Sequence, residues 1–379
     1  MHTLTSKLPH VGTTIFTVMS KMAAEYNAIN LSQGFPNFPV NKELLNAYHE
    51  VIDESFHQYM PMPGYGPLMV EVAEKIHTHY GRQIHPDSEL LITAGATQAI
   101  FTAIQAVVHA GDEVVVLDPS YDCYAPSVEL CGGRPVHVNL NADFSVNWNK
   151  VSDVITAKTR LIIVNNPHNP GGAVLSLTDI EALEAILGKH PHVLFLSDEV
   201  YEYIHFDASH ISANSREKLV NKTIVVSSFG KTFHVTGWKI GYLVAPDFIM
   251  SEIKKVHQFN VFCVNSTAQA ALAKYLPQTD LSELSSFYKQ KRDLFRNLIT
   301  GSKFELLDCK GSYFQVARYS EISDLNDVDF SIELTKRYGV AVIPVSVFNK
   351  DKHDDKLIRF CFAKDNDTLI KSAEKLCKI

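Results

Sequence analysis

Three groups of polar side chains follow short apolar stretches of the sequence. They occupy residues 165–172, 197–201 and 227–232. Each group comes directly after a run of the β-branched and apolar residues that form buried strands. In an open α/β sheet, ligands bind beyond the carboxyl ends of the strands. We therefore expect Asn169, Asp198, Tyr201 and Lys231 to meet in one pocket, although they are far apart in the sequence.

The side chains of this predicted pocket suit an aldehyde cofactor that carries a pyridine ring and a phosphate. A lysine such as Lys231 forms a Schiff base with an aldehyde. A carboxylate such as Asp198 keeps the ring nitrogen protonated, which makes the ring an electron sink, and phenol and amide groups can hold a ring oxygen. A phosphate requires backbone N–H groups at a helix start, with hydroxyls and a cation nearby; matching residues are Gly95, Ala96, Thr97, Ser228 and Lys239. Together these features describe pyridoxal 5′-phosphate (PLP).

Five motifs, in order along the chain, resemble the class I aminotransferases, which are PLP-dependent enzymes of fold type I. The motifs are Asn169-Pro170-Gly171-Gly172, Asp198-Glu199-Val200-Tyr201, Ser228-Phe229-Gly230-Lys231-Thr232-Phe233, Thr236-Gly237-Trp238-Lys239-Ile240-Gly241 and Ile358-Arg359-Phe360-Cys361-Phe362. The resemblance begins at Ser32-Gln33-Gly34-Phe35-Pro36 and covers nearly the whole chain. It implies transfer of an α-amino group to a 2-oxo acid by a ping-pong mechanism.

The resemblance implies a role for each residue that would hold the cofactor. Lys231 would form the Schiff base and move protons, and Asp198 would pair with the ring nitrogen. Tyr201 and Asn169 would hold the ring hydroxyl oxygen, and Tyr121 would stack on the ring. The phosphate would be bound by Gly95, Ala96, Thr97, Ser228 and Lys239. Lys239 stands where many relatives carry arginine, so its contact would be that of a point charge.

The resemblance also implies how the substrate is held and how the chain assembles. Arg359 would bind the substrate α-carboxylate through two parallel hydrogen bonds, with the backbone of Gly34 and with Asn169 beside it. Tyr65 matches a tyrosine that reaches the phosphate of the neighbouring subunit, which implies a homodimer with shared sites.

Within the family, the chain is most similar to the methionine, kynurenine and glutamine aminotransferase subgroup. We see no second arginine for a dicarboxylic side chain, so we expect a neutral or aromatic substrate. Methionine is the first choice, followed by phenylalanine, tyrosine, leucine, glutamine and kynurenine. Candidate residues for the lining of the side-chain pocket, by resemblance alone, are Phe16, Phe35 and Tyr26.

Other interpretations stay open at this point. The same motifs occur in carbon–sulfur β-lyases, which would release pyruvate from cystathionine. A non-catalytic PLP-binding regulator would need a DNA-binding module, for which we expect no room in 379 residues. Taken singly, Asp198 could cap a helix, Lys231 could be a solvated surface lysine, and Tyr65 could lie in a rigid surface turn. Arg359, in an apolar strand, could pair with a structural carboxylate rather than with a substrate.

The elements that must position these residues alternate in type, which predicts an α/β fold. We expect strands at residues 90–93, 113–117, 135–138, 160–164, 193–197, 223–227 and 240–245, with helices at 97–108 and 177–187 between them. This pattern is typical of a mostly parallel central sheet flanked by helices. After residue 277 the pattern becomes α+β, with a helix expected around residues 328–338. The tail, residues 365–379, is expected to form a closing amphipathic helix with Leu369, Ile370, Ala373 and Leu376 on one face. We predict an N-terminal segment (1–45) that contributes to the smaller domain, a large PLP-binding domain (46–276) and a small C-terminal domain (277–379).

Composition and missing motifs exclude several classes of protein. The net charge is −7 and there is no basic block, so we expect no nucleic-acid partner and no membrane partner. The apolar runs are far shorter than a membrane span, and the six cysteines include no Cys-x-x-Cys pair, which favours a cytoplasmic protein with reduced thiols. The sequence contains no complete phosphate loop, dinucleotide fingerprint, His-Glu-x-x-His or Gly-x-Ser-x-Gly motif, and we expect no metal.

Overall fold

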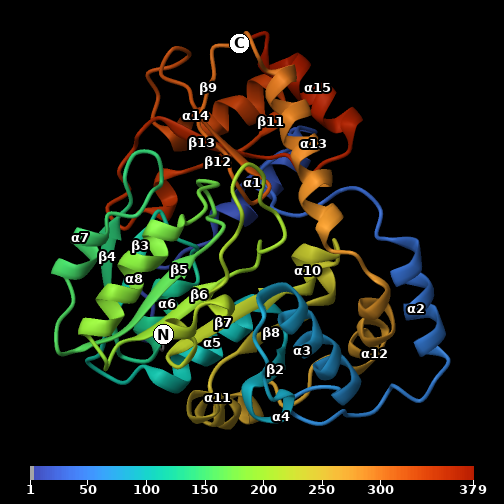
Figure 1. Ribbon diagram of the computed structural model, residues 1–379. Helices are drawn as coiled ribbons and strands as arrows, with labels where there is room; N and C mark the ends of the chain where they lie inside the picture. Colours follow the sequence, from blue (N-terminus) through green and yellow to red (C-terminus); the bar gives the residue numbers. More distant parts are fainter. Residues whose placement is uncertain (1–3) are drawn as a thin grey trace.

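A computed structural model describes residues 4–379 of the chain, and its centre is a seven-stranded sheet (Figure 1). The strand order is β2-β8-β7-β6-β5-β3-β4. The strands are β2 (Leu90–Thr93), β3 (Glu113–Asp118), β4 (Arg134–Asn139), β5 (Thr159–Asn165), β6 (Leu194–Asp198), β7 (Thr223–Ser228) and β8 (Gly241–Val244). Strands β4, β3, β5, β6 and β7 run parallel, whereas β8 is antiparallel to both β7 and β2. The sheet is therefore mostly parallel, and all seven predicted strands are present.

Helices cover both faces of this sheet because its strands carry apolar side chains on both sides. In β2, Leu91 belongs to one apolar cluster, and Leu90 and Ile92 belong to another on the opposite face. The first face is covered by α5 (Gly95–Val107), α6 (Tyr124–Leu130) and α11 (Asp247–Asn260). The second face is covered by α7 (Trp148–Asp153), α8 (Leu177–Lys189), α9 (Glu217–Val220), α3 (Gly66–Tyr80), α2 (Lys42–Ile52) and α12 (Ser266–Tyr275), with the short helix α4 (Pro86–Glu89) before β2.

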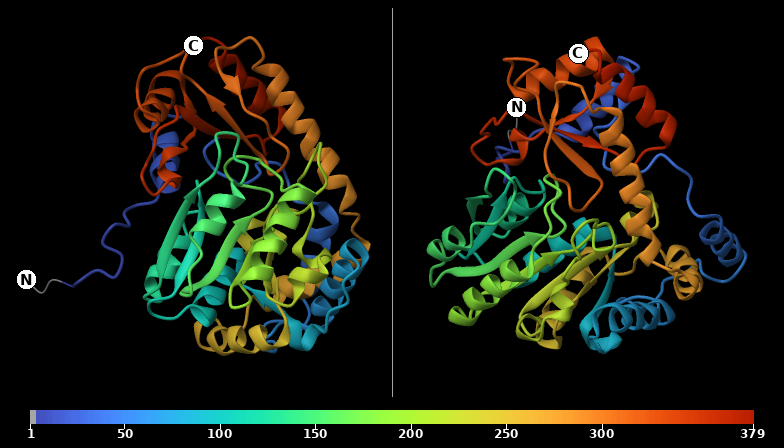
Figure 2. Two further views of the ribbon diagram at one scale, coloured as in Figure 1. Left: turned by 60° about the vertical axis from the view of Figure 1, so that its left-hand side comes forward. Right: turned by 45° about the horizontal axis from the view of Figure 1, so that its top comes forward.

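A second layer of structure lies above the carboxyl ends of the parallel strands (Figures 1 and 2). It contains the antiparallel sheet β12-β13-β10-β9, built from β9 (Glu305–Leu306), β10 (Phe314–Arg318), β12 (Ile343–Pro344) and β13 (Leu357–Cys361). Helices α13 (Ser282–Leu298), α14 (Asp327–Glu333) and α15 (Asn366–Leu376) belong to this layer. The N-terminal segment joins it, because β1 (Ile29–Asn30), which follows α1 (Ile15–Glu25), pairs with β11 (Val340–Ala341).

Two predictions for the C-terminal region need correction. The helical pattern around residues 328–338 is not one α-helix: α14 ends at Glu333 and the chain continues as a π-helical segment, Leu334–Tyr338. In α15, Leu369, Ala373 and Leu376 are buried as expected, but Ile370 is exposed, and Ser372 takes a place on the buried face. Within residues 4–379, no helix combines the length and the apolar character needed to cross a membrane.

Candidate functional site

The carboxyl ends of three neighbouring parallel strands bring the predicted polar groups together. In the sheet register, Asn165 at the end of β5 lies beside Asp198 at the end of β6, and Asp198 lies beside Val226 of β7. Strand β7 ends at Ser228, and the short helix α10 (Phe229–Thr232) then carries Lys231. Asn165, Asp198, Ser228 and Lys231 line a cavity of about 330 Å³; the other predicted residues that line it are Phe16, Gly34, Gly95, Ala96, Thr97, Tyr121, Asn169, Tyr201, Lys239 and Arg359.

One end of the cavity is an anion-binding helix start. Helix α5 begins at Gly95, so the free backbone N–H groups of its first turn face this end, where the helix dipole is positive. Gly95 has a φ of +75°, and a Cβ there would lie 3.3 Å from Nζ of Lys239. A glycine at this point therefore lets a cation, a hydroxyl from Ser228 and helical N–H groups line one small space. That combination suits a phosphate.

A buried carboxylate also lines the cavity. Asp198 is 3 % exposed, and burial raises the pKa of its carboxyl group to about 6. Its Oδ2 accepts a hydrogen bond of 2.5 Å from the hydroxyl of Tyr124, and its Oδ1 accepts one of 3.4 Å from the backbone N–H of Val200. Both contacts favour the ionised carboxylate and oppose the effect of burial. A cationic ring nitrogen would favour it further.

The amine of Lys231 is held without a close carboxylate partner among the residues that the structure describes. Its Nζ donates to the backbone oxygen of Gly34 at 3.1 Å and to the hydroxyl of Tyr313 at 2.9 Å. Burial, together with the nearby cations Arg359 and Lys239, lowers the pKa of this amine to about 8. An amine with this pKa is partly neutral near pH 8, which a base or a nucleophile requires.

Arg359 of β13 is a buried guanidinium that is only partly satisfied by the protein. It is 1 % exposed, and burial lowers its pKa to about 10. Its Nη1 donates to Oδ1 of Asn169 at 2.8 Å and its Nη2 donates to the backbone oxygen of Ser32 at 2.9 Å, while its Nε has no partner within the described chain. No carboxylate of residues 4–379 forms an ion pair with it. The structural alternative for Arg359, pairing with an acidic side chain of the chain itself, therefore lacks support.

Three predicted residues complete the walls of the cavity. Tyr201 is buried and its ring meets that of Tyr313 edge to face, with the centroids 5.1 Å apart. Tyr121 lies over the start of α5, where its hydroxyl is 3.2 Å from Oγ1 of Thr97. Phe16 of α1 lies beside the guanidinium of Arg359, whose Cζ is 5.4 Å from the centroid of the Phe16 ring. The N-terminal helix thus reaches the same cavity as the ends of the central strands.

Three other predicted residues do not reach the cavity of the described chain. Tyr26 ends α1 and is exposed, with its ring beside Nζ of Lys336. Phe35 is exposed beside Lys364, outside the cavity wall. Tyr65 precedes α3 and packs edge to face on Phe56, away from the cavity. Tyr65 was expected to act in a neighbouring subunit, which a single chain does not test.

Sequence reasoning missed three residues that contact the predicted groups directly. Tyr124 bonds to Asp198, Tyr313 bonds to Lys231, and Asn165 donates to the backbone oxygen of Asp198 while accepting from the backbone N–H of Asn169. Asn165 ends an apolar strand, so its position was a usable signal. Tyr124 and Tyr313 lie 74 and 82 residues from their partners, and nothing local marks them.

The residues present fit PLP. A phosphate would lie at the start of α5, and a pyridine ring would lie between Tyr121 and the strand ends, with its nitrogen toward Asp198. The aldehyde would meet Lys231, whose amine is not tied to a carboxylate within the described chain. These matches rest on the charge, burial and hydrogen-bonding capacity of residues that line one cavity.

Comparisons with known proteins point to one family of enzymes. The family model described as "Aminotransferase class I and II" matches residues 26–376. The chain is 46 % identical to a methionine aminotransferase of Escherichia coli over 98 % of this chain and 97 % of that protein. It is 34 % identical to human kynurenine–oxoglutarate transaminase 1 over 94 % of each chain. The crystal structure of YbdL from Escherichia coli, whose title reports a methionine aminotransferase function, superposes with a TM-score of 0.97 at 44 % identity and covers all of both chains.

Proposed function

The chain belongs to the aminotransferase class I and II family, whose members depend on PLP, and from this premise we propose that it transfers the α-amino group of methionine to a 2-oxo acid. It is an amino-acid aminotransferase. The observation that carries the proposal is one cavity that joins the partly neutral amine of Lys231, the buried carboxylate of Asp198 and the unsatisfied guanidinium of Arg359. These are the groups that a reaction at the Cα of an amino acid requires.

The central step of the proposal is a proton transfer by Lys231. The bound cofactor supplies an electron sink that stabilises negative charge at the substrate Cα. Lys231 takes the proton from Cα with its neutral amine, and its pKa of about 8 makes that form accessible near neutral pH. Asp198 keeps the neighbouring ring nitrogen protonated, and Tyr124 supports its ionised form. Tyr201 and the amide of Asn169 orient the ring from its oxygen-bearing side.

Arg359 orients the substrate by its α-carboxylate. The carboxylate would accept from guanidinium N–H groups that the contacts with Asn169 and Ser32 leave free, and the amide of Asn169 would form a second contact. The Cζ of the Arg359 guanidinium lies 3.9 Å from the ring centroid of Phe314, and this contact fixes the plane of the guanidinium and its fork of N–H groups. A fixed fork makes a bidentate contact and so sets the direction of the Cα–H bond relative to Lys231.

The cavity wall favours an uncharged substrate side chain. The cationic residues that line it within the described chain are Lys231, Lys239 and Arg359, and each already has a proposed partner. No further cation remains there for a second carboxylate. Phe16 and Phe314 supply apolar surface near Arg359, which suits the thioether of methionine or the ring of an aromatic amino acid. Phenylalanine, tyrosine, leucine, glutamine and kynurenine are therefore the next substrates to test.

We propose that the enzyme is a homodimer in which Tyr65 contacts the phosphate bound by its partner. Support comes from large apolar side chains that are exposed in a single chain near Tyr65. Tyr59 is 83 % exposed and packs on Phe262, and the segment before Tyr65 also contacts Cys263 and Ser266. Exposed aromatic surface of this kind is typical of an interface.

A mixing experiment tests the shared site. Tyr65→Ala and Lys231→Ala variants would each be inactive alone, and a hybrid dimer would contain one site with both residues intact. Random mixing of equal amounts should restore about a quarter of the sites, because half of the dimers are hybrids with one complete site each. A mixture that stays inactive while forming hybrids would refute the sharing of Tyr65.

The domain division and the compartment also remain proposals. Residues 46–276 contain the central sheet, 277–379 contain the antiparallel sheet, and the β1–β11 pairing supports the assignment of the segment 1–45 to the smaller domain. A cytoplasmic location is supported by six cysteines that are all free within the described chain.

An amino-acid panel tests the reaction and its substrate. The holoenzyme is incubated with each candidate amino acid and a 2-oxo acid, and both products are quantified; the 2-oxo acid of methionine should form at the highest kcat/KM. The relatives named above are aminotransferases, which favours transfer over β-elimination. Release of pyruvate and ammonia from cystathionine in place of transfer would contradict the proposal, and the Lys231→Ala variant is the control for both reactions.

A further inference from the structure

The hydroxyl of Tyr313 forms a closed set of hydrogen bonds with Lys231 and the loop that carries Gly34. The amine of Lys231 donates to Tyr313 at 2.9 Å and to the carbonyl of Gly34 at 3.1 Å. The Tyr313 hydroxyl donates its own hydrogen to the same Gly34 carbonyl at 2.5 Å. Since burial raises the pKa of Tyr313 well above its usual range, the phenol stays neutral and has one hydrogen to give. Its oxygen can therefore only accept from Lys231.

This arrangement decides which way the lone pair of the amine points. A neutral amine nitrogen has four tetrahedral directions: the bond to Cε, two N–H bonds and one lone pair. With one N–H directed to Tyr313 and the other to Gly34, only the lone-pair direction stays free. Lys231 and Gly34 line the cavity, whereas Tyr313 is fully buried behind them. The free direction is then available to a group in the cavity.

We propose that Tyr313 is a positioning residue that directs the lone pair of the Lys231 amine toward the substrate Cα. The inference rests on the proposed function for the identity of the proton donor, but the hydrogen-bond geometry is independent of it. Without the Tyr313 hydroxyl, one N–H loses its acceptor, and the amine can rotate so that its lone pair points elsewhere.

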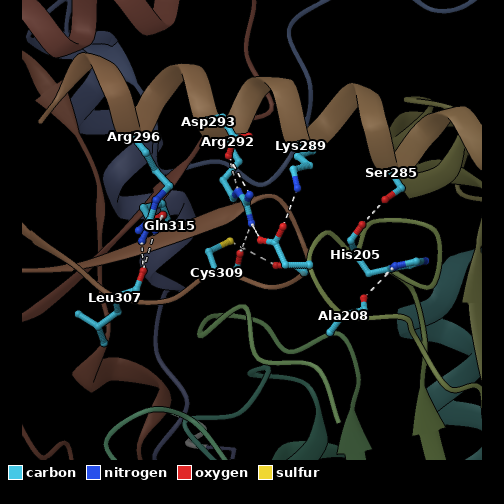
Figure 3. Close-up of polar contacts among 12 residues, drawn as sticks. His205, Ala208, Ser285, Lys289, Arg292, Asp293, Arg296, Leu307, Cys309 and Gln315 are labelled. Carbon is cyan, nitrogen blue, oxygen red and sulfur yellow. Dashed lines mark hydrogen bonds and ion pairs between the residues drawn. The ribbon is translucent and has the colours of Figure 1, made fainter. Parts of the chain in front are cut away.

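The backbone around Tyr313 is built to hold the ring in place. A Cβ at Gly34 would lie 2.8 Å from Cζ of Phe314, so only glycine allows its carbonyl to come this close. Helix α13 fixes the segment before Tyr313: Nη1 of Arg292 donates to the carbonyl of Cys309 at 2.8 Å, and Arg296 donates to the carbonyl of Leu307 at 2.9 Å (Figure 3). The backbone N–H of Ser312 also donates to the carbonyl of Ile204 at 2.8 Å.

Tyr288 offers a matched control for Tyr313. Both tyrosines are fully buried, and their ring centroids are 5.6 Å apart. The Tyr288 hydroxyl has no hydrogen-bond partner within the described chain, whereas the Tyr313 hydroxyl has two. Tyr288→Phe therefore removes a buried oxygen from the same aromatic cluster without removing a contact to Lys231.

The first test measures the titration of the Lys231 amine itself in the cofactor-free full-length protein. Competitive labelling with acetic anhydride across a pH series, with the Lys231 peptide quantified by mass spectrometry, gives the pH at half reactivity. Tyr313→Phe removes an acceptor that favours the ammonium form, so the midpoint should fall by about one pH unit. Tyr288→Phe should leave it unchanged. The groups facing the amine are the same in both variants; they are Asp198, Tyr201, Lys239, Arg359 and Cys361.

The second test separates positioning from binding in the holoenzyme. Tyr313→Phe should lower kcat by roughly 10-fold while KM changes by less than about 2-fold, since the substrate contacts remain. A histidine ring nitrogen can accept a hydrogen bond, so Tyr313→His should have a labelling midpoint and a kcat between those of Tyr313→Phe and the wild type. An unchanged midpoint in Tyr313→Phe, or an equal shift in Tyr288→Phe, would overturn the inference. A failure of the wild-type protein to transaminate would instead refute the proposed function and leave the labelling result to decide the role of Tyr313.

Discussion

Tyr124 donates a hydrogen bond of 2.5 Å to Oδ2 of Asp198, and both side chains are buried. The two residues come from different elements: Tyr124 begins the helix α6, whereas Asp198 ends the strand β6. Burial alone would favour a neutral carboxyl group, which could not keep a ring nitrogen protonated. The phenol thus counteracts the effect of burial on the one carboxylate that the site requires to be charged.

Removing the Tyr124 hydroxyl should shift the acidic limb of the pH profile of kcat. The hydrogen bond lowers the pKa of Asp198, so in Tyr124→Phe that pKa should rise and the carboxylate should be lost at a higher pH. We expect the acidic limb of the kcat profile to shift upward by about one pH unit. Tyr288→Phe is the control. An acidic limb at the wild-type position in Tyr124→Phe would contradict the role given to Tyr124.

Asp198 should lower the stability of the cofactor-free protein at neutral pH. Its pKa of about 6 lies above its value in an unfolded chain, so the folded state binds the proton more tightly between about pH 4 and pH 6. Stability is therefore lost as the pH rises through this range and stays low above it. Asp198→Asn should be more stable than the wild type by about 3 kcal/mol at pH 8 and equally stable near pH 4. Urea unfolding at both pH values measures the difference; an equal difference at both would argue against a raised pKa.

Replacing Arg359 by lysine should affect substrates that carry an α-carboxylate and spare those that lack one. A lysine keeps the charge but not the planar fork, so kcat/KM for methionine should fall by at least about 100-fold. The amine that corresponds to methionine without its carboxylate should react at similar low rates with both enzymes. An equal loss for the two substrates would mean that Arg359 supports the structure of the site rather than the carboxylate.

Asp207 should contribute stability that disappears in acid. Lys289 and Arg292 lower the pKa of its carboxyl group to about 2, below the unfolded value, so its contribution is present above about pH 4 and is lost as the pH falls through about 2. The side chain is 52 % exposed, so screening limits the effect of Asp207→Asn to less than about 1 kcal/mol at pH 6. The difference in urea midpoint between wild type and variant should be smaller at pH 3 than at pH 6, and added salt should narrow the difference at pH 6. A gap that widens in acid would contradict this assignment.

The central sheet could be predicted because its strands are continuous apolar runs with polar residues at their ends. Strand β2 has the predicted bounds, and the position of Asp198 after a buried strand placed it at the ligand-binding edge. The prediction of Phe35 and Tyr26 as lining residues relied on resemblance alone, and the orientation of α1 and the following loop directs both side chains outward. Those orientations depend on packing between distant segments, such as the pairing of β1 with β11, and no local pattern encodes them.

The role of Tyr313 could not be predicted from the sequence for the same reason. Its contact with Lys231 requires the antiparallel sheet to pack over the parallel one, with Gly34 between them. Each of the three segments is predictable alone, but their meeting point is not. Residues such as Tyr313, which contact a catalytic side chain without lining the cavity, are therefore found only in the structure. The residues that carry out the chemistry can be found in the sequence.

The proposed reaction is tested most directly by the absorbance spectrum of the purified holoenzyme during titration with methionine. The lysine-bound cofactor should absorb at about 420 nm, and methionine alone should convert this band to one at about 330 nm, which a 2-oxo acid should then reverse. Lys231→Ala should show neither the first band nor the conversion. A wild-type protein that forms no such band with added PLP, or that keeps it unchanged with every amino acid of the panel, would contradict the assignment of Lys231 and with it the proposed reaction.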